Sequence, residues 1–401
     1  MSEQPEFPEV RDPSETAAIL ECKEVLIVGL NPAFQTTLYF DNYRQGKVNR
    51  AYRKSHSIGG KGQNVAMACE QHGEKDKVSI LQFIGGMTGS YIQRVLDEKG
   101  IHQISVPVAK GTRTCTTVLD KRTGEMTELI EPAGRVGAEE RELLEKWAVT
   151  LLKDPKLEAI ALCGSLPPGI TGSTYTLIAE NKPEKCVLLL DACSDVDCLK
   201  TGKVDILKIN SEEAAVLAGM AVTDPEDLLS IGKHLIKTRK IKILAITNGP
   251  DTAYLFDTTR HSSSKHVLIT EYHLPPLVEV LAEEREDKPF LPLSTPPMSR
   301  SLPEATGMME IPLARVESGN DLKALWGKKE ILLNPLGAGD TCSGVFLLEF
   351  METMDAAQAF RYGLAAASAS CLIIDHTSHF DPPIMHKIFD AITYEQFEEP
   401  L

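Results

Sequence analysis

The 401-residue sequence lacks an excess of positive charge, a long apolar run and an apolar signal segment. Lys and Arg total 42 against 57 Asp and Glu, which gives a formal net charge of -15. Because this charge repels a polyanion at long range, we expect no non-specific binding to nucleic acid. No apolar run is long enough to cross a bilayer, and the first 15 residues are acidic and contain proline, so we expect neither a membrane nor a secreted protein.

Paired cysteines and two common nucleotide fingerprints are also absent. The nine cysteines include no C-x-x-C pair, which argues against a disulfide framework or a zinc site and predicts free thiols in the cytoplasm. There is no G-x-x-x-x-G-K-[S/T], and "GLNPAF" follows the first apolar run where a G-x-G-x-x-G would stand. The sequence therefore argues against a P-loop enzyme and a dinucleotide dehydrogenase.

What the sequence does contain is a long alternation of short aliphatic runs and amphipathic segments. This pattern predicts parallel strands joined by crossover helices, and so a three-layer α/β/α sandwich with a mostly parallel central sheet. We expect strands at 24–30, 78–85, 157–164, 186–191, 204–210, 242–247 and 330–334. We expect helices at 63–72, 89–99, 138–152, 211–219 and 225–238.

Two stretches interrupt this alternation. Residues of about 33–58 and 112–132 favour extended structure, with turn residues Gly46 and Gly124 near their centres, and they predict a small separate sheet.

The domain boundaries follow from the same pattern. One main domain is expected over residues 24–390, with tails at 1–23 and 391–401. Residues 279–329 are polar and proline-rich without a sustained period, which predicts an insertion. A tolerated surface insertion is favoured over a partner-docking or regulatory loop.

The stretch "NPLGAGDTCSG", residues 334–344, predicts a glycine turn between a strand and a helix. The backbone N–H groups of Gly337, Ala338 and Gly339 are expected to form a nest for a phosphate. Asp340 stands where the helix begins, and we expect it to stay ionised and to take a proton from an attacking hydroxyl. The alternative is a tight turn in which the aspartate is only a helix cap.

A second glycine cluster, "SIGGKGQNVAMA", opens another helix at residues 57–68. The backbone amides of Gly59 and Gly60, together with the amide of Asn64, are expected to bind a neutral polyol. The alternative is a turn whose glycines serve only close helix packing.

Together the G-G-K-G-x-N and G-A-G-D-T-x-x-G loops resemble those of the PfkB, or ribokinase-like, carbohydrate kinases. "CGSLPPG", "LKINSEEA" and "ITNGPDTAYLF" occur in the order seen in the hexose-phosphate branch, which includes 1-phosphofructokinase, tagatose-6-phosphate kinase and the minor 6-phosphofructokinase. The resemblance implies an ATP-holding core and a small β-sheet lid over the sugar. It also implies that Asp340 is the general base and that the amides of residues 337–339 stabilise the transferred phosphoryl group.

The resemblance also implies a nucleotide site. Asn210 and Glu213 match a pair that organises magnesium through water, and Lys208 would lie near the triphosphate. Thr247 and Gly249 match residues that flank ATP, although Thr252 stands where the motif usually carries a second glycine. The alternative for each of these residues is a helix cap or a surface charge.

Basic residues gather in the two expected lid stretches against the acidic background. They are Arg44, Lys47, Arg50, Arg53, Lys54 and Arg113. Lys47, Arg50 and Arg113 are the candidates for clamping the phosphate that is not transferred. The resemblance supports Lys47 and Arg113 and supports Arg50 more weakly. The other three basic side chains are better explained as a solvated strand face.

Gln35 stands where the resembling family usually has an aspartate that accepts hydrogen bonds from sugar hydroxyls, and Ser165 of "CGSLPPG" is expected near the substrate. The resulting hypothesis is an ATP- and magnesium-dependent kinase of fructose 1-phosphate, fructose 6-phosphate or tagatose 6-phosphate. Alternatives are a kinase of an unphosphorylated sugar or nucleoside and a non-catalytic sugar-phosphate-binding regulator. The lid is also a candidate surface for a homodimer.

Overall fold

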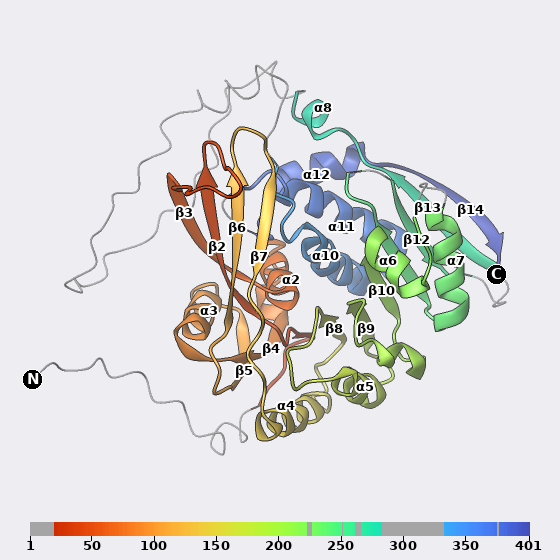
Figure 1. Cartoon of the computed structure of the whole chain (residues 1–401). Coiled ribbons are helices and arrows are strands. Elements are labelled where there is room, and N and C mark those ends of the chain that lie inside the picture. Colours follow the sequence, from red (N-terminus) through yellow and green to blue (C-terminus); the bar gives the residue numbers. More distant parts are fainter. Residues whose placement is uncertain (1–19, 223–226, 251, 261–265, 283–332, 375–376) are drawn as a thin grey trace, which may run out of the picture.

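The computed structural model describes residues 20–222, 227–250, 252–260, 266–282, 333–374 and 377–401, and its strands form two separate sheets (Figure 1). The larger sheet has ten strands in the order β14-β13-β12-β11-β10-β9-β8-β1-β4-β5. These strands are β1 (Val25–Val28), β4 (Val78–Ile84), β5 (His102–Pro107), β8 (Ala159–Cys163), β9 (Val187–Asp191), β10 (Ile206–Asn210), β11 (Ile243–Thr247), β12 (Ala253–Asp257), β13 (His266–His273) and β14 (Thr393–Pro400). The pairs from β11 to β5 are parallel, whereas β12, β13 and β14 add an antiparallel edge.

Helices cover both faces of this sheet because alternate strand residues point to opposite sides. In β1, Val25 and Ile27 belong to one buried cluster and Leu26 and Val28 to another. The first cluster is completed by α2 (Lys61–Gln71), α3 (Gly86–Glu98), α8 (Leu277–Ala282), α10 (Ala338–Thr353), α11 (Ala356–Ser370) and α12 (Pro382–Ala391). The second is completed by α4 (Ala138–Leu151), α5 (Gly172–Asn181), α6 (Ser211–Ala218) and α7 (Asp227–Arg239). Two short 3-10 helices are η2 (Lys75–Lys77) and η3 (Asp197–Thr201). The predicted three-layer α/β/α sandwich is confirmed.

The smaller sheet has the order β3-β2-β6-β7 and lies beside the main sandwich (Figure 1). Its strands are β2 (Ala33–Phe40), β3 (Arg53–Gly59), β6 (Arg113–Asp120) and β7 (Met126–Ile130). Gly46 and Gly124 lie in the two connecting turns with φ of 72° and 74°. The two extended stretches therefore pair as one sheet, as the sequence predicted, and we call this sheet the lid.

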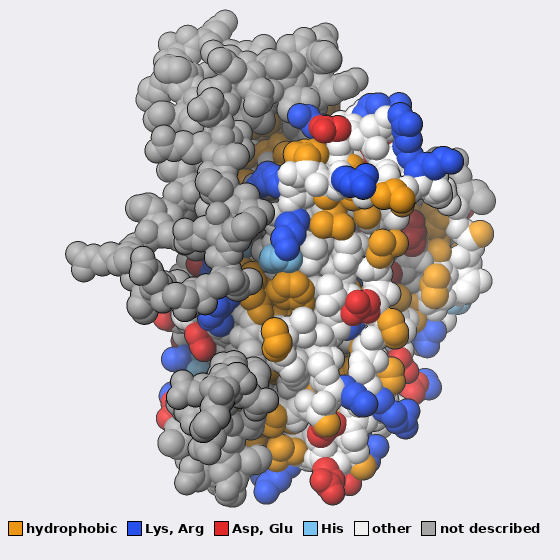
Figure 2. Space-filling model, turned by 60° about the vertical axis from the view of Figure 1, so that its left-hand side comes forward, with side chains coloured by type: hydrophobic (Ala, Val, Ile, Leu, Met, Phe, Trp, Pro, Cys, Tyr) orange, Lys and Arg blue, Asp and Glu red, His pale blue; other side chains and the backbone are white. Residues whose placement is uncertain are grey.

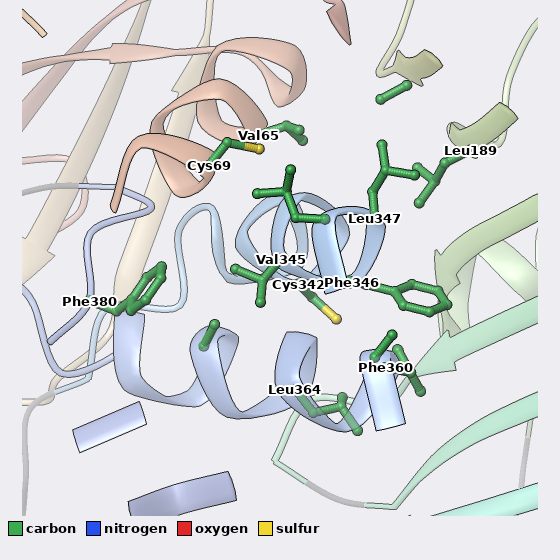
Figure 3. Packing of buried hydrophobic residues seen from close by; sticks show 14 of the residues in the cluster. Val65, Cys69, Leu189, Cys342, Val345, Phe346, Leu347, Phe360, Leu364 and Phe380 are labelled. Carbon is green, nitrogen blue, oxygen red and sulfur yellow. The ribbon is translucent and has the colours of Figure 1, made fainter. Parts of the chain in front are cut away.

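Helix α10 is held between α2 and α11 by packed apolar side chains (Figure 3). The rings of Phe346 and Phe360 lie 5.3 Å apart between α10 and α11. Val65 and Cys69 of α2 belong to the same buried cluster. Because a close-packed interior resists displacement, this contact fixes where the N-terminus of α10 lies.

Several sequence-based boundaries need correction. Residues 391–401 were expected as a tail, but β14 pairs with β13 along its whole length. Its sequence, "TYEQFEEP", has no aliphatic run because an edge strand is held largely by backbone hydrogen bonds on one side. In the expected strand at 330–334, residues 330–332 lie outside the described residues, and residues 333 and 334 form no strand. Of the expected insertion, 279–282 belong to α8, and 283–329 lie outside the described residues.

Candidate active site

The candidate site lies where neighbouring parallel strands end. Asp191 is the last residue of β9, Asn210 of β10 and Thr247 of β11. Asn210 and Thr247 are register partners, and Asp191 is the partner of Cys163 at the end of β8. Carboxyl ends of parallel strands share one edge of a sheet, which is where α/β proteins commonly bind ligands.

The glycine turn before α10 meets this edge. The Nζ atom of Lys208 on β10 donates to the carbonyl of Gly339 at 2.8 Å. Gly337 is the helix N-cap with φ of 75°, and a Cβ there would lie 2.7 Å from the Ser378 hydroxyl oxygen. Glycine is required at this position because both the backbone conformation and the space exclude a side chain.

Asp340 is the third residue of α10, so the alternative in which it caps the helix is not what the structure shows. The N–H of Ala338 donates to the carbonyl of Pro335 at 3.1 Å within the turn. Of the three backbone N–H groups predicted to bind a phosphate, that of Ala338 is thus used within the turn. The N–H groups of Gly337 and Gly339 are the two that remain as candidates.

The Asp340 carboxyl is buried at 8% exposure and is oriented by Asn64 of α2. The Asn64 side-chain nitrogen donates to Oδ2 of Asp340 at 2.7 Å, and the Thr377 hydroxyl donates to Oδ1 of Asn64 at 3.1 Å. The backbone N–H of Asn64 donates to the carbonyl of Gly60 at 2.9 Å. The backbone N–H of Asn64 is thus used within α2, and its side-chain amide orients the Asp340 carboxylate; binding of a polyol by Gly59, Gly60 and Asn64 stays a prediction.

Burial, and after it the neighbouring Asp191 carboxylate, raise the pKa of the Asp340 carboxyl to about 6. The Lys61 ammonium, the hydrogen bond from Asn64 and the Lys208 ammonium act in the opposite direction on this pKa. The position of Asp340 at the helix start predicted an ionised carboxylate, but desolvation opposes ionisation and outweighs that effect on the pKa. The result suits proton transfer near neutral pH, since a general base works best when its pKa is close to the working pH.

A network of paired charges surrounds the Asp340 carboxyl. Lys61 Nζ lies 2.8 Å from Oδ1 of Asp191 and 2.8 Å from Oε1 of Glu213. The other Asp191 oxygen accepts a hydrogen bond from the Ser343 hydroxyl at 2.5 Å and lies 3.8 Å from Nζ of Lys208. Burial disfavours both charges, yet the attraction of Lys208 and Lys61 lowers the pKa of Asp191, and the surrounding carboxylates raise the pKa of Lys61.

Lys61 and Asp191 were not among the residues predicted from the sequence to form the site. Each left a signal. Lys61 is the lysine of G-G-K-G, and Asp191 is the single charged residue ending the aliphatic run "VLLLD" of β9. A charged residue at the end of a buried parallel strand needs a partner, which marks it as a candidate for the site.

A cavity of about 160 Å³ adjoins this network and gathers several of the predicted residues. It is lined by Gly29, Asn31, Lys61, Gly62, Gln63, Arg113, Cys163, Gly164, Ser165, Ala192, Cys193, Ser194 and Glu213. Arg113 donates to the Asn31 carbonyl at 3.2 Å, and the Asn31 side chain donates to the Ser165 hydroxyl at 3.0 Å. Typical ligand pockets measure about 300–1,000 Å³, so this cavity holds part of one substrate rather than two whole ones. Asp340 is not among the lining residues, but its carboxyl interacts electrostatically with Lys61, which is one of them.

Lys47 and Arg50 do not line the cavity. Both are exposed in the connection between β2 and β3. Asn49 holds this connection by accepting from the backbone of Arg44 at 2.9 Å and donating to the carbonyl of Lys47 at 3.0 Å. The guanidinium of Arg53 lies over the Tyr39 ring at 4.9 Å. Of the predicted phosphate clamp, the structure brings only Arg113 to the cavity.

Asn210 and Glu213 form a reciprocal cap at the start of α6. The backbone N–H of Glu213 donates to Oδ1 of Asn210 at 2.7 Å, and the backbone N–H of Asn210 donates to Oε2 of Glu213 at 3.1 Å. The helix-cap alternative therefore holds for both side chains. Glu213 also lines the cavity and pairs with Lys61, so an acidic side chain borders that space.

These geometric features accompany a clear family relationship. Residues 25–271, more than half of the chain, match the family described as pfkB family carbohydrate kinase. The chain belongs to this family. None of the helices in the described ranges is long and apolar enough to cross a membrane.

Individual relatives point to the hexose-phosphate branch. The tagatose-6-phosphate kinase of Staphylococcus epidermidis is 28% identical over 204 residues, which are 50% of this chain and 64% of that protein. The chain thus spans just under two thirds of that relative. The structure of phosphofructokinase-2 from Escherichia coli in complex with substrates and products aligns with a TM-score of 0.67 at 19% identity. The alignment covers 92% of this chain and 99% of the phosphofructokinase-2 chain. The same protein in complex with fructose-6-phosphate has a TM-score of 0.64 at 18% identity, with the same coverage. These two structural likenesses establish the fold.

Proposed function

We propose that this protein transfers the γ-phosphoryl group of ATP to a hydroxyl of a ketohexose phosphate, with Asp340 as the general base. The observation that carries the proposal is the meeting of a glycine turn, a helix N-terminus and a buried carboxyl of raised pKa at one sheet edge. Phosphoryl transfer depends on positioning and charge stabilisation, and these parts supply both. Polar and charged side chains lie next to Asp340: Asn64 donates to it, and Asp191, Lys61 and Lys208 interact with its charge.

The residues present fit a magnesium nucleotide. Gly337 and Gly339 stand at the N-terminus of α10, where the absence of side chains and the partial positive charge of the helix end would favour a phosphate close to the backbone. Lys208 is buried beside this turn, and Glu213 would hold magnesium through water together with Asn210. Few protein ligands are needed, since magnesium keeps several waters and phosphate oxygens when bound. Thr247 and Gly249, at the end of β11, would flank the nucleotide.

The sugar phosphate would lie between the lid and the cavity. Arg113 is half-buried at the cavity, where its guanidinium can bind a phosphate bidentately, and Ser165 lies in the same lining. Lys47 and Arg50 belong to the exposed lid connection and would contribute only if that connection moved toward the ligand. Fructose 6-phosphate, tagatose 6-phosphate and fructose 1-phosphate are the proposed substrates, and the named relatives favour the first two.

We further propose that two lids form a homodimer. Exposed apolar side chains occur on the lid, including Tyr52 at 53%, Leu129 at 55% and Ile130 at 59% exposure. Figure 2, in which the lid side of the molecule comes forward, shows hydrophobic side chains mixed with Lys and Arg on this face. Light scattering of Leu129→Glu against the unchanged protein tests this, and an equal mass for both would contradict it.

A substrate panel tests the catalytic proposal. ADP release is measured with MgATP and each of the three sugar phosphates, with the corresponding free sugars and with nucleosides. Turnover confined to sugar phosphates is the expected result. Turnover only with free sugars or nucleosides would place the protein with the wider family, and binding of a sugar phosphate without ADP release would indicate a regulator.

A further inference from the structure

The Tyr175 side chain on α5 is fully buried, and its hydroxyl reaches the backbone at the end of β8. The hydroxyl oxygen lies 3.1 Å from the carbonyl oxygen of Cys163 and 3.2 Å from that of Gly164. Because a carbonyl oxygen can only accept, the hydroxyl is the donor, and its one hydrogen serves these two acceptors. Cys163 and Gly164 both line the cavity described above. Tyr175 therefore contacts the backbone of the cavity wall without lining the cavity itself.

Gly164 needs an outside group to fix the direction of its carbonyl. Its φ is 83°, in the region that glycine enters freely, so no side chain of its own restricts this backbone. The N–H of Gly164 donates to the carbonyl of Asp191 at 2.8 Å, which holds one side of the residue. Within the described residues, no backbone N–H donates to the Gly164 carbonyl, so the other side is held by the Tyr175 hydroxyl.

The residue that follows Gly164 in the chain belongs to the proposed sugar site. Ser165 and Arg113 are predicted substrate-binding residues that line the cavity, whereas Gln35 is buried within the lid. The Asn31 side chain donates to the Ser165 hydroxyl at 3.0 Å, and Arg113 donates to the Asn31 carbonyl at 3.2 Å. A rotation of the peptide between residues 164 and 165 would move Ser165 away from Asn31.

We propose that Tyr175 is a positioning residue whose hydroxyl fixes the peptide between Gly164 and Ser165 and so keeps Ser165 in place for the sugar phosphate. This inference rests on the proposed function, in which the cavity holds part of that substrate. Within the described part of the chain, Tyr175 makes no hydrogen bond to the glycine turn before α10, where the nucleotide would bind. Loss of the hydroxyl should therefore affect the sugar phosphate and spare ATP.

Tyr175→Phe removes the hydroxyl and keeps the ring. We expect the KM for the sugar phosphate to rise roughly three- to tenfold, the range typical for loss of one neutral hydrogen bond. The KM for ATP and kcat should change less than about twofold.

Tyr272→Phe is the matched control. Tyr272 is also fully buried, and its hydroxyl donates to the carbonyl of Ala357 at 2.7 Å. This bond joins β13 to α11, and neither element lines the cavity. Both variants should lower the melting temperature by a similar amount, about 1–4 °C, because each leaves a buried carbonyl without its donor. Only Tyr175→Phe should raise the KM for the sugar phosphate.

A double-mutant cycle tests whether Tyr175 acts through Ser165. Ser165→Ala should raise the KM for the sugar phosphate by itself. In a protein that already carries Ser165→Ala, adding Tyr175→Phe should raise this KM by less than about twofold, because both changes remove the same contact. Independent effects that multiply would show that Tyr175 acts at another place, and this would overturn the inference.

The outcomes separate the inference from the function on which it rests. If the unchanged protein phosphorylates a sugar phosphate and Tyr175→Phe leaves its KM unchanged, the positioning role is wrong and the function stands. An equal rise in both KM values, or the same rise in Tyr272→Phe, would also refute the role. If the protein binds a sugar phosphate without ADP release, dissociation constants from titration calorimetry replace KM in the same comparisons. If it neither binds nor phosphorylates any sugar phosphate of the panel, the proposed function fails and the inference fails with it.

Discussion

Replacing the buried base should make the protein less active and more stable at the same time. Asp340→Asn keeps the size of the side chain and an oxygen that can accept from Asn64, but it cannot take a proton. Because general-base catalysis typically contributes 10²–10⁴ in rate, we expect kcat to fall at least about a hundredfold, with ATP affinity nearly intact.

The gain in stability follows from the pKa of this carboxyl, which burial raises from 3.8 to about 6. Between these two pH values the folded chain binds more protons at Asp340 than the unfolded chain does. The contribution of this group to stability is therefore present at low pH and is lost as the pH rises through 6. One pKa unit corresponds to about 1.36 kcal/mol, so the ionised group costs roughly 3 kcal/mol above pH 6.

Asparagine does not titrate and avoids this cost. The free energy of unfolding of Asp340→Asn should thus match that of the unchanged protein near pH 4 and exceed it by roughly 2–3 kcal/mol at pH 7.5. Denaturant unfolding or thermal melting at several pH values measures the difference. Glu352→Gln is a control on the same helix, because it removes a carboxylate whose side chain is 59% exposed and should change stability by less than about 0.5 kcal/mol at any pH.

Two results would refute this reasoning. One is a difference in the free energy of unfolding between Asp340→Asn and the unchanged protein that stays constant from pH 4 to pH 7.5. Such a result would mean that ionisation of the buried Asp340 carboxyl does not cost stability. Near wild-type turnover in Asp340→Asn would remove the proposed base, whatever the stability. In the unchanged protein, kcat/KM should fall on the acid side with a midpoint close to pH 6.

Three further substitutions probe the surroundings of the base. Arg113→Ala should raise the KM for the sugar phosphate far more than the KM for ATP, and an equal rise in both would contradict its role as a phosphate clamp. Lys61→Met removes a cation that lowers the pKa of Asp340, so the acid side of the kcat/KM profile should move to higher pH. A profile at the same pH would show that the Lys61 charge does not influence the proposed base. Gly337→Ala places a Cβ 2.7 Å from the Ser378 hydroxyl oxygen at a residue whose φ is 75°. This variant should lower the free energy of unfolding by about 1–3 kcal/mol and reduce kcat. An unchanged melting temperature and unchanged turnover would show that the turn tolerates a side chain.

Much of the fold could be read from local pattern. Buried parallel strands need continuous aliphatic runs, so β1, β4, β8, β9, β10 and β11 were predicted within a few residues. β14 was missed because an edge strand needs no such run, and its pairing with β13 links residues more than a hundred positions apart.

The sequence by itself determined the class of fold, the two glycine turns and the identity of the acidic residue after the second one. Each of these depends on neighbouring residues, through periodicity or through the backbone freedom of glycine. Only the tertiary structure decided what surrounds that acid. Asn64 and Asp340 are 276 positions apart in the chain, and Lys61 and Asp191 are 130 apart. Which charges meet, and how strongly burial shifts a pKa, depends on distances in space that no local pattern encodes.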